Sequence, residues 1–200
     1  MLPDEITNQT YDRIAASFAE RYWNITLDRA LNSFAALVRS AYSVLDLGCG
    51  PGRDIELLRQ RGLRVLGADR SAGMLTESRR RVGGALVQAD MRSLPLRAGA
   101  LGGVWMCASL LHIPRLDVPT VLAGVRRVLR PGGALYLSVQ EGVGEKWSES
   151  DGGQRFFTFF QLEELMALLS EAEFTVKEDW TEAGGHSTWI HVLATRPEEE

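Results

Sequence analysis

The sequence predicts an α/β protein built on a mostly parallel β-sheet. Between residues 43 and 140, strand-like apolar runs alternate with helical runs, and this alternation is typical of right-handed βαβ crossovers. A glycine-rich loop directly follows the first strand, where open parallel sheets bind their ligands. Two further strand-like segments near the end of the chain predict a closing hairpin.

The elements can be placed in order from their flanking residues. The predicted strands are 43–47, 64–69, 85–89, 104–107, 134–139, 174–180 and 187–195, and the helices after the first strand are 53–61, 71–82, 118–129 and 161–172. Ser71 is an N-cap residue for the second of these helices, and Gly83 with Gly84 ends it. Residues 141–151 are polar and contain glycine, which predicts a loop.

The first 40 residues form a helical segment with aromatic and apolar positions at Tyr11, Ile14, Phe18, Tyr22 and Trp23. We expect this segment to lie as a lid over the carboxyl edge of the sheet, and residues 141–160 to form an insertion on the substrate side. A chain of 200 residues with 45% hydrophobic content suits one domain, residues 1–200, with a substantial core.

The amino-acid composition limits the kinds of molecule that the chain is expected to bind. The net charge is −4 and the sequence pI is near 5.5, so the chain has no general attraction for nucleic acid or anionic membranes. No apolar stretch approaches the roughly 20 residues that span a bilayer, and the start lacks the pattern of a signal peptide. Cys49 and Cys107 are expected to be reduced thiols, and the location cytoplasmic. The oligomeric state is left open.

The loop after the first strand reads Gly48-Cys49-Gly50-Pro51-Gly52 and is preceded by Asp46. Alternating glycines allow a tight turn and a close approach of the backbone to a ligand. The spacing is one residue short of the dinucleotide fingerprint, and a negative charge at Asp46 suits a cationic ligand better than a pyrophosphate. Asp46 could equally be a buried capping group.

The run from Val44 to Asp54 resembles the first motif of class I S-adenosylmethionine (SAM)-dependent methyltransferases. Leu94-Pro95-Leu96 and Arg130-Pro131-Gly132-Gly133 are similar to further stretches of that family, and the resemblance covers residues 11–195. It implies a three-layer Rossmann-like sandwich with seven strands in the order 3-2-1-4-5-7-6, the last strand antiparallel. It also implies SAM as cofactor and in-line methyl transfer without a metal, most simply to a small molecule.

The resemblance assigns roles to residues at the strand ends. Asp69, about 20 residues after the loop, would bind the ribose hydroxyls, although it could instead cap the next helix. Asp90 and Met91 would contact the adenine, and a solvated Asp90 is the alternative. The rest of the expected cofactor set comprises Tyr11, Asp46, Gly48, Cys49, Gly50, Gly52, Arg70, Met74 and Cys107.

The segment that ends the fourth strand carries His112, which is either a general base or a packing residue. It lacks the Pro-Pro and Pro-Cys motifs of DNA base methyltransferases, and no Asp or Glu lies between Asp90 and Asp117, so we expect no metal. His186 and His191 are expected to be structural.

The acceptor pocket is expected beside Trp147 and the segment 155–160, in which Arg155 would bind an anionic group among phenylalanines. Core packing of the phenylalanines and a surface or structural Arg155 are the alternatives.

Two other functions stay open. An RNA or protein methyltransferase of the same fold would use the same cofactor residues. A non-enzymatic dinucleotide-binding module would bind NAD, which the shortened glycine spacing argues against.

Overall fold

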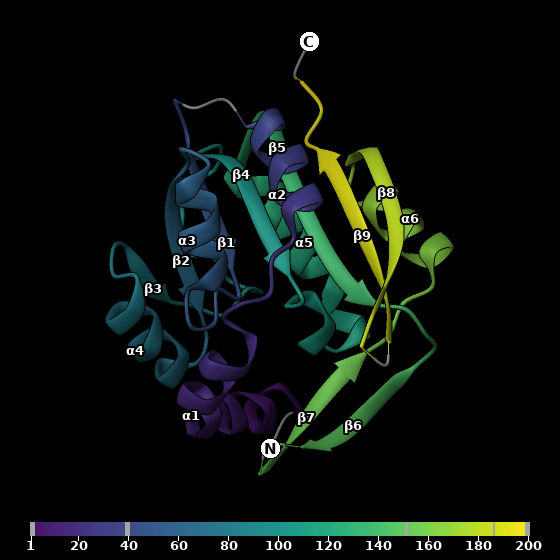
Figure 1. The fold of residues 1–200 in the computed structure, drawn as a ribbon. Helices are drawn as coiled ribbons and strands as arrows, with labels where there is room; N and C mark the ends of the chain where they lie inside the picture. The colour runs from purple at the N-terminus through teal and green to yellow at the C-terminus, as the bar shows by residue number, and fades with distance from the viewer. Residues whose placement is uncertain (1–2, 39–40, 151, 186, 199–200) are drawn as a thin grey trace.

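The computed structural model describes residues 3–38, 41–150, 152–185 and 187–198. Seven strands form one sheet in the order β3-β2-β1-β4-β5-β9-β8 (Figure 1). Strand β9 runs antiparallel to both β5 and β8, whereas the pairs among β1 to β5 are parallel. The predicted α/β class, the strand order and the antiparallel last strand are confirmed.

The elements match the predicted ones closely in position. The strands of the sheet are β1 Ser43–Leu47, β2 Arg64–Asp69, β3 Leu86–Gln88, β4 Leu101–Cys107, β5 Leu129–Gln140, β8 Thr175–Gly184 and β9 Ser187–Thr195. The helices are α1 Pro3–Tyr22, α2 Asp28–Leu37, α3 Arg53–Gln60, α4 Ala72–Arg81, α5 Val118–Val128 and α6 Leu162–Glu171. Short 3-10 turns cover Leu110–His112 and Arg115–Asp117.

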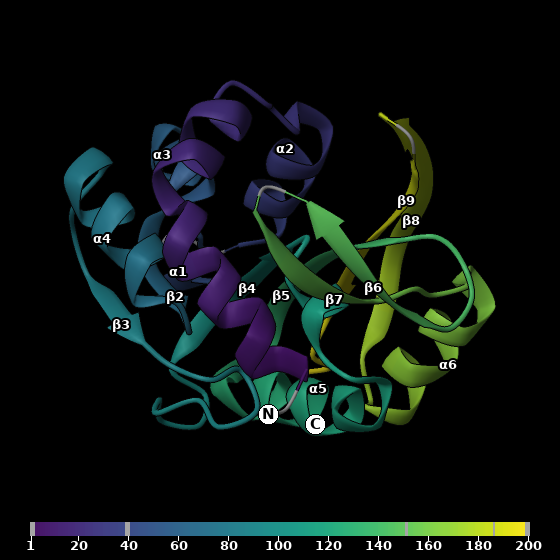
Figure 2. The ribbon, with the colours of Figure 1, turned by 90° about the horizontal axis from the view of Figure 1, so that it is seen from below.

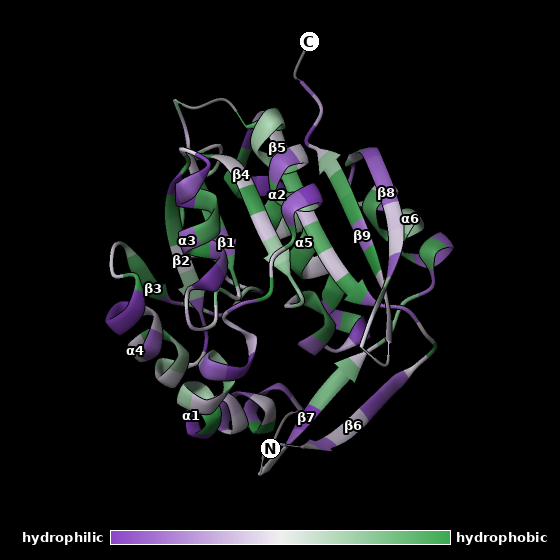
Figure 3. Cartoon of the chain, viewed as in Figure 1, coloured by the Kyte–Doolittle hydropathy of each residue, from purple (hydrophilic) through white to green (hydrophobic). Residues whose placement is uncertain are grey.

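Helices cover both faces of the sheet, which explains why its central strands are apolar along their length (Figure 3). On one face, Leu31 and Phe34 of α2 pack with Trp105 and Tyr136. Helices α3 and α4 lie on the same side and share a smaller cluster around Ile55. On the opposite face, apolar side chains of α5 and α6 join those of β1, β4, β5 and β9 in the largest core cluster.

Residues 3–38 of the expected lid segment form two helices with different positions. Helix α1 crosses below the carboxyl ends of the strands, between α4 and β7 (Figure 2). Helix α2 instead belongs to the sheet face, because Leu31 and Phe34 are fully buried there. Helix α1 therefore lies at the edge where a lid was expected, whereas α2 packs on a face of the sheet.

The expected loop at residues 141–151 is also partly wrong. Strands β6 Glu145–Ser150 and β7 Gly153–Thr158 form a separate two-stranded hairpin below the sheet (Figure 1). Trp147 pairs with Phe156 across this hairpin, and β7 buries Phe156 and Thr158 on one side. Because β6 is a polar edge strand, its sequence lacks the alternating apolar residues that predict a strand. No helix among the described residues is both long enough and apolar enough to cross a bilayer.

Candidate functional site

The glycine loop between β1 and α3 is built from three left-handed residues. Gly48, Gly50 and Gly52 have φ values of +79°, +51° and +92°. A Cβ on Gly48 would lie 2.4 Å from Cβ of Ser109, so this position has no room for a side chain. A Cβ on Gly50 would meet no atom within 4 Å. Gly48 therefore holds the loop against the β4 end, whereas Gly50 leaves its backbone open to a ligand.

Asp69, at the end of β2, fastens this loop. Its Oδ2 accepts a hydrogen bond from the amide of Gly50, and its Oδ1 accepts one from the amide of Ser71, both at 2.8 Å. Burial raises the pKa of Asp69, although those amide bonds oppose the shift. Asp69 therefore holds the N-cap residue Ser71 of α4, whereas the cap itself is the Ser71 side chain, which accepts from the amide of Met74. Asp69 also lines the cavity described below.

Asp46 lies beneath the loop rather than in the cavity. It is 1% exposed, and burial followed by the nearby charge of Asp54 raises its pKa well above the ordinary value. Asp54 itself pairs with Arg53 at 2.6 Å and accepts from the indole of Trp105 at 2.9 Å. Asp46 is therefore placed to support the loop from below.

Gly52 is likewise outside the cavity. A Cβ at this position would lie 2.6 Å from both Ser78 Oγ and Val82 Cγ2 of α4. Its role in this structure is the close packing of the loop against α4.

Cys107 ends β4 and lines the floor of the cavity. Burial, assisted by the nearby charge of Asp54, raises the pKa of its thiol to about 12. A thiol with this pKa is not ionised near neutral pH, which argues against Cys107 as a nucleophile. Both cysteines are free.

A cavity of about 750 Å³ lies at the carboxyl edge of the sheet. Its size falls within the ~300–1,000 Å³ typical of sites for small ligands. At one end it is lined by the loop and by residues expected to contact the cofactor, namely Gly48, Cys49, Gly50, Asp69, Arg70, Met74, Asp90, Met91 and Cys107. At the other end it is lined by residues from β5, β7 and the β8–β9 hairpin, and α1 contributes lining residues from Asp4 to Tyr22.

Helix α1 roofs the cavity and is held at both sides. Asp12 accepts hydrogen bonds from Ser71 Oγ at 2.7 Å and from the amide of Gly73 at 2.9 Å, at the start of α4. A side chain at Gly73 would collide with the α1 backbone at 2.5 Å. On the β7 side, Thr10 donates to the carbonyl of Gln154 at 2.8 Å. Polar contacts therefore seat α1 over the site.

His112 has both ring nitrogens engaged. Nδ1 lies 2.7 Å from the carbonyl oxygen of Phe156, and Nε2 lies 2.7 Å from the hydroxyl of Tyr11. Because a carbonyl only accepts, Nδ1 carries the proton and Nε2 accepts from Tyr11. Burial lowers the pKa of His112 to about 4. His112 is thus neutral near pH 7 with its lone pair already in use, which argues against the base function that the sequence allowed.

Arg155 of β7 lines the cavity. Its guanidinium stands 5.6 Å from the ring centre of Tyr11 and 5.5 Å from that of Phe157. Nη1 also donates to the Tyr11 hydroxyl at 3.4 Å. Arg155 thus places a guanidinium against two aromatic rings in the lining of the cavity.

Trp147 does not line the cavity. Its ring is 45% exposed and packs edge-on against Phe156, 5.5 Å away. His191 does line the cavity, and it also bonds Tyr136 at 2.8 Å and stacks on Trp180. His186 lies outside the described residues.

The sequence reasoning missed several charged residues that shape the cavity. Arg53 lines it directly after the glycine loop, and Asp4 lines it from α1. Arg92 bonds Asp90, and Asp12 seats α1. Arg53 directly follows Gly52, so its place at the cavity could have been predicted from the sequence. Asp4 and Asp12 could not, because they are near the site only through the position of α1. Within the described ranges, no group of three or more His, Cys, Asp or Glu could hold a metal ion.

Comparison with known proteins identifies the family. Residues 44–133 match the model of a methyltransferase domain. An uncharacterised methyltransferase of Synechocystis is 30% identical over 162 residues, which are 76% of this chain and 76% of that protein. Together with the fold and the loop, this relationship shows that the chain belongs to the class I SAM-dependent methyltransferases.

Relatives with named acceptors are similar over part of their length. Trans-aconitate 2-methyltransferase of Methylobacterium nodulans is 33% identical over 76% of this chain and 62% of its own length. Malonyl-[acyl-carrier protein] O-methyltransferase of Serratia marcescens is 33% identical over 61% of this chain and 49% of its own length. The chain thus spans less than two thirds of either protein.

Solved structures share the fold. A SAM-dependent methyltransferase of Methanosarcina mazei has a TM-score of 0.77 at 18% identity, covering 88% of this chain and 100% of that one. The 1,6-didemethyltoxoflavin-N1-methyltransferase of Burkholderia thailandensis was solved with S-adenosylhomocysteine. It has a TM-score of 0.75 at 21% identity, covering 99% of this chain and 92% of that one.

Proposed function

We propose that this chain transfers a methyl group from SAM to a small anionic acceptor. The observation that carries the proposal is one cavity with two chemically different ends. The glycine loop and Asp69 lie at one end, and Arg155 lies among aromatic side chains at the other. A donor and an acceptor bound in the same cavity are close enough to react.

The residues of the first end fit SAM. Gly50 leaves room for a ligand against its backbone, and Asp69 lines the cavity beside it with acceptor positions for ribose hydroxyls. Arg70, Met74, Asp90 and Met91 would surround the adenine, and Tyr11 and Cys107 would lie toward the methionine part. When bound, SAM supplies an electrophilic methyl group on its sulfonium. The chain then has to hold an acceptor atom in line with that methyl group and keep water out.

The acceptor end supports an anionic substrate. Arg155 supplies a guanidinium, and Tyr11 and Phe157 supply the aromatic walls around it. The acceptors named for two relatives, trans-aconitate and the malonyl group, carry carboxylates. A carboxylate needs no general base, which agrees with the neutral, fully bonded His112.

We also propose that residues 1–200 act as one domain, with α1 as the lid and residues 141–160 on the acceptor side. The two free cysteines and the acidic composition support a cytoplasmic location. Metal independence is proposed because the β4 end presents Cys107, Ala108 and Ser109, where a hard cation would need carboxylates.

Isothermal titration calorimetry tests the cofactor assignment. We expect S-adenosylhomocysteine to bind and NAD not to bind. Binding of NAD alone would favour the dinucleotide-binding alternative, and a mobility shift with bulk RNA would favour an RNA methyltransferase.

A further inference from the structure

We infer that His191 of β9 donates a hydrogen bond from Nε2 to an uncharged oxygen atom of the methyl acceptor. The acceptor then carries a carbonyl, hydroxyl or ether oxygen in addition to the anionic group assigned to Arg155. This inference rests on the proposed function and deepens it, because it names a second group that recognises the acceptor. The sequence alone predicted only a structural role for His191.

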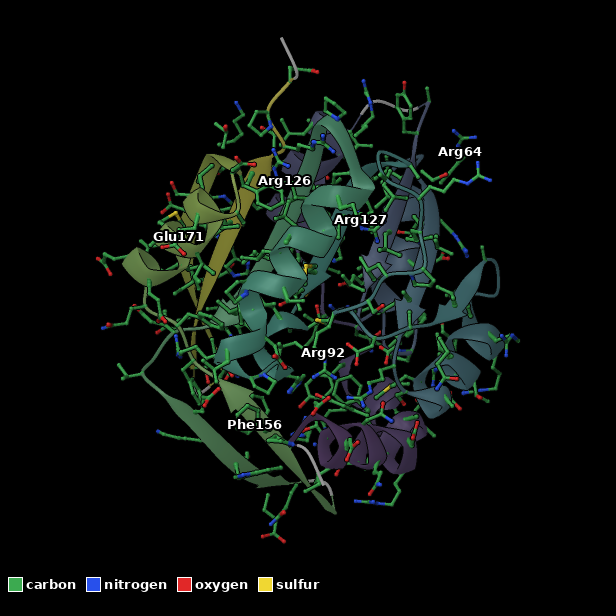
Figure 4. All side chains as sticks on the ribbon, turned by 180° about the vertical axis from the view of Figure 1, so that it is seen from behind. Arg64, Arg92, Arg126, Arg127, Phe156 and Glu171 are labelled. Atoms are coloured by element: carbon green, nitrogen blue, oxygen red, sulfur yellow. The ribbon has the colours of Figure 1, made fainter. Side chains whose placement is uncertain are left out.

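His191 lies on the floor of the cavity, level with the end of β4. The strand register pairs Cys107 with Ser138 and Ser138 with His191, so these residues form a row across β4, β5 and β9. All of them line the cavity. Arg155 comes from β7, and Figure 4 shows the next residue, Phe156, below the sheet beside α1. His191 and Arg155 therefore reach the cavity from different sides.

The ring of His191 is held in place by its neighbours. Nδ1 lies 2.8 Å from the hydroxyl of Tyr136, and Trp180 stacks on the ring with 4.9 Å between ring centres and 2° between planes. Burial lowers the pKa of His191, and the nearby charge of Glu182 opposes this shift while that of Arg29 adds to it. The ring is therefore neutral near pH 7, with one donor nitrogen and one acceptor nitrogen.

The hydroxyl of Tyr136 determines which of these nitrogens carries the proton. Tyr136 is fully buried, so its hydroxyl proton needs an acceptor within the protein. Oγ of Ser138 also lies beside this hydroxyl, but it already accepts from the amide of Ala108 at 3.0 Å. Nδ1 of His191 is therefore the acceptor of the Tyr136 proton, and the ring proton is on Nε2.

Nε2 of His191 is open to the cavity. In the part of the chain that the structure describes, Nε2 makes no hydrogen bond, and it is not one of the buried polar atoms that lack a partner. It is therefore accessible. His191 also lines a smaller cavity of about 90 Å³, and Thr26, Leu27 and Glu182 line both cavities. The smaller cavity is thus a side extension of the main one, and His191 lies where the two meet.

The charge near Nε2 decides which kind of oxygen it can bind. Oε2 of Glu182 lies 4.0 Å from Nε2, beyond hydrogen-bond distance. A carboxylate bound at Nε2 would be repelled by this charge, whereas an uncharged oxygen would not. The anionic group of the acceptor therefore belongs with the cation Arg155. A water molecule is the competing partner for Nε2, because the extension has room for one.

The first test is the position of the ring proton. Protein with isotope-labelled histidine is studied by NMR in the presence of saturating S-adenosylhomocysteine, and each ring is assigned through its bonds to the backbone. We expect a neutral His191 with the proton on Nε2. His112 is the internal control, with the proton on Nδ1, because this nitrogen donates to the carbonyl of Phe156. A proton on Nδ1 of His191 would overturn the inference, and this test needs no variant.

The second test compares probe acids that differ at one group. The parent acids are pentanoate, hexanoate and heptanoate. Their partners are 4-oxopentanoate, 5-oxohexanoate and 6-oxoheptanoate, which add a carbonyl at increasing distance from the carboxylate. Dissociation constants come from NMR titration of the wild type, His191→Phe and Arg155→Ala, each with S-adenosylhomocysteine bound. His191→Phe keeps a ring that can stack on Trp180 but removes both nitrogens. Arg155→Ala is the matched control, since it should weaken both members of a pair alike.

For the pair of matching length, the preference for the oxo acid over its parent should be about three- to tenfold larger in the wild type than in His191→Phe, as for one uncharged hydrogen bond. Arg155→Ala should keep the preference while both affinities fall. In the wild type this oxo acid should shift the signal of the Nε2 proton and its parent should not. The dicarboxylates of the same lengths should bind less tightly than the oxo acid, and Glu182→Gln should reduce that difference.

Equal preferences in the wild type and His191→Phe for all pairs would overturn the inference, as would a wild type that binds the dicarboxylates most tightly. If the parent acids still bind in that case, water is the partner of Nε2 and the proposed function stands. If His191→Phe does not fold, the shift of the Nε2 proton decides, and an equal shift with oxo acid and parent refutes the role. A wild type that binds S-adenosylhomocysteine but no acid would refute the anionic acceptor as well, and one that does not bind S-adenosylhomocysteine would refute the cofactor assignment itself.

Discussion

The hydroxyl of Tyr11 lies 2.7 Å from Nε2 of His112, and this contact joins the lid helix to the end of β4. The opposite nitrogen of the same ring donates to Phe156 on β7. One neutral imidazole therefore connects three elements that surround the acceptor end of the cavity. Its two hydrogen bonds are those of a structural link, and they leave no lone pair for proton abstraction.

The first prediction concerns stability at low pH. The folded-state pKa of His112 is about 4, below its ordinary value of 6.5. The unfolded chain therefore takes up a proton as the pH falls below 6.5, while the folded protein does not until about pH 4. The contribution of the neutral His112 ring to the free energy of unfolding is therefore complete above pH 6.5, and it is lost as the pH falls from 6.5 to about 4.

We expect urea unfolding to show a loss between pH 7 and pH 5 that is larger in the wild type than in His112→Asn. The difference should be about 1–2 kcal/mol, because the ring also lines the cavity, where water screens part of its charge. Identical pH dependence in the two proteins would mean that His112 is not held neutral in the folded state.

Asp69→Ala should weaken the binding of S-adenosylhomocysteine. The substitution removes acceptors for the ribose and also releases the amides of Gly50 and Ser71. Loss of hydrogen bonds to a charged group corresponds to about 1.5–3 kcal/mol, or roughly ten- to a hundred-fold in affinity. Calorimetry checks the affinity and thermal unfolding checks the fold. Unchanged affinity in a folded variant would refute the ribose assignment.

Gly48→Ala and Gly50→Ala should separate folding from binding. Both positions have positive φ, which costs an alanine about 1–2 kcal/mol. Gly48→Ala should lower the melting temperature further, because its Cβ would overlap that of Ser109. In Gly50→Ala the new methyl group meets no protein atom, so this variant should lose less stability than Gly48→Ala. Its cofactor affinity should fall, because the methyl group would occupy space beside the backbone that the cofactor approaches. Equal losses of stability and affinity in the two variants would contradict this division.

Arg155→Ala should raise the KM for the acceptor and leave cofactor affinity nearly unchanged, because the guanidinium lies at the acceptor end. Lys146→Ala is the matched control, since this lysine lies on the same hairpin and is exposed, outside the cavity. Steady-state kinetics with the acceptor, once it is identified by labelling, checks both. A wild-type KM and kcat in Arg155→Ala would refute the pocket assignment.

Excess EDTA should leave the rate of transfer unchanged, because the β4 end offers Cys107, Ala108 and Ser109 in place of carboxylates. The control is the same assay with added magnesium. A strict requirement for a divalent cation would show that the site has been misinterpreted.

The sheet could be predicted because its signals are local. The apolar run before Gly48 and the acid at Asp69 mark strand ends, and Ser71 caps α4 by accepting from the amide of Met74 at 3.0 Å. Strand order and the antiparallel last strand came with the family resemblance, since local signals say nothing about which strands pair.

The lid side of the site was not predictable in the same way. Strand β6 is polar and has no periodic apolar face, so its sequence predicted a loop. Trp147 was expected in the acceptor pocket, but its side chain lies exposed on this hairpin. Asp4 lines the cavity and Asp12 bonds Ser71 only because α1 crosses the sheet edge, which is a tertiary arrangement with no signature in the helix itself.

Transfer of labelled methyl from SAM to a small-molecule extract tests the central claim most directly. We expect the wild-type protein to place label in the fraction of low molecular mass, in an anionic product, and Asp69→Ala to place much less at limiting SAM. No transfer to any fraction, or label confined to RNA or protein, would contradict the proposed function.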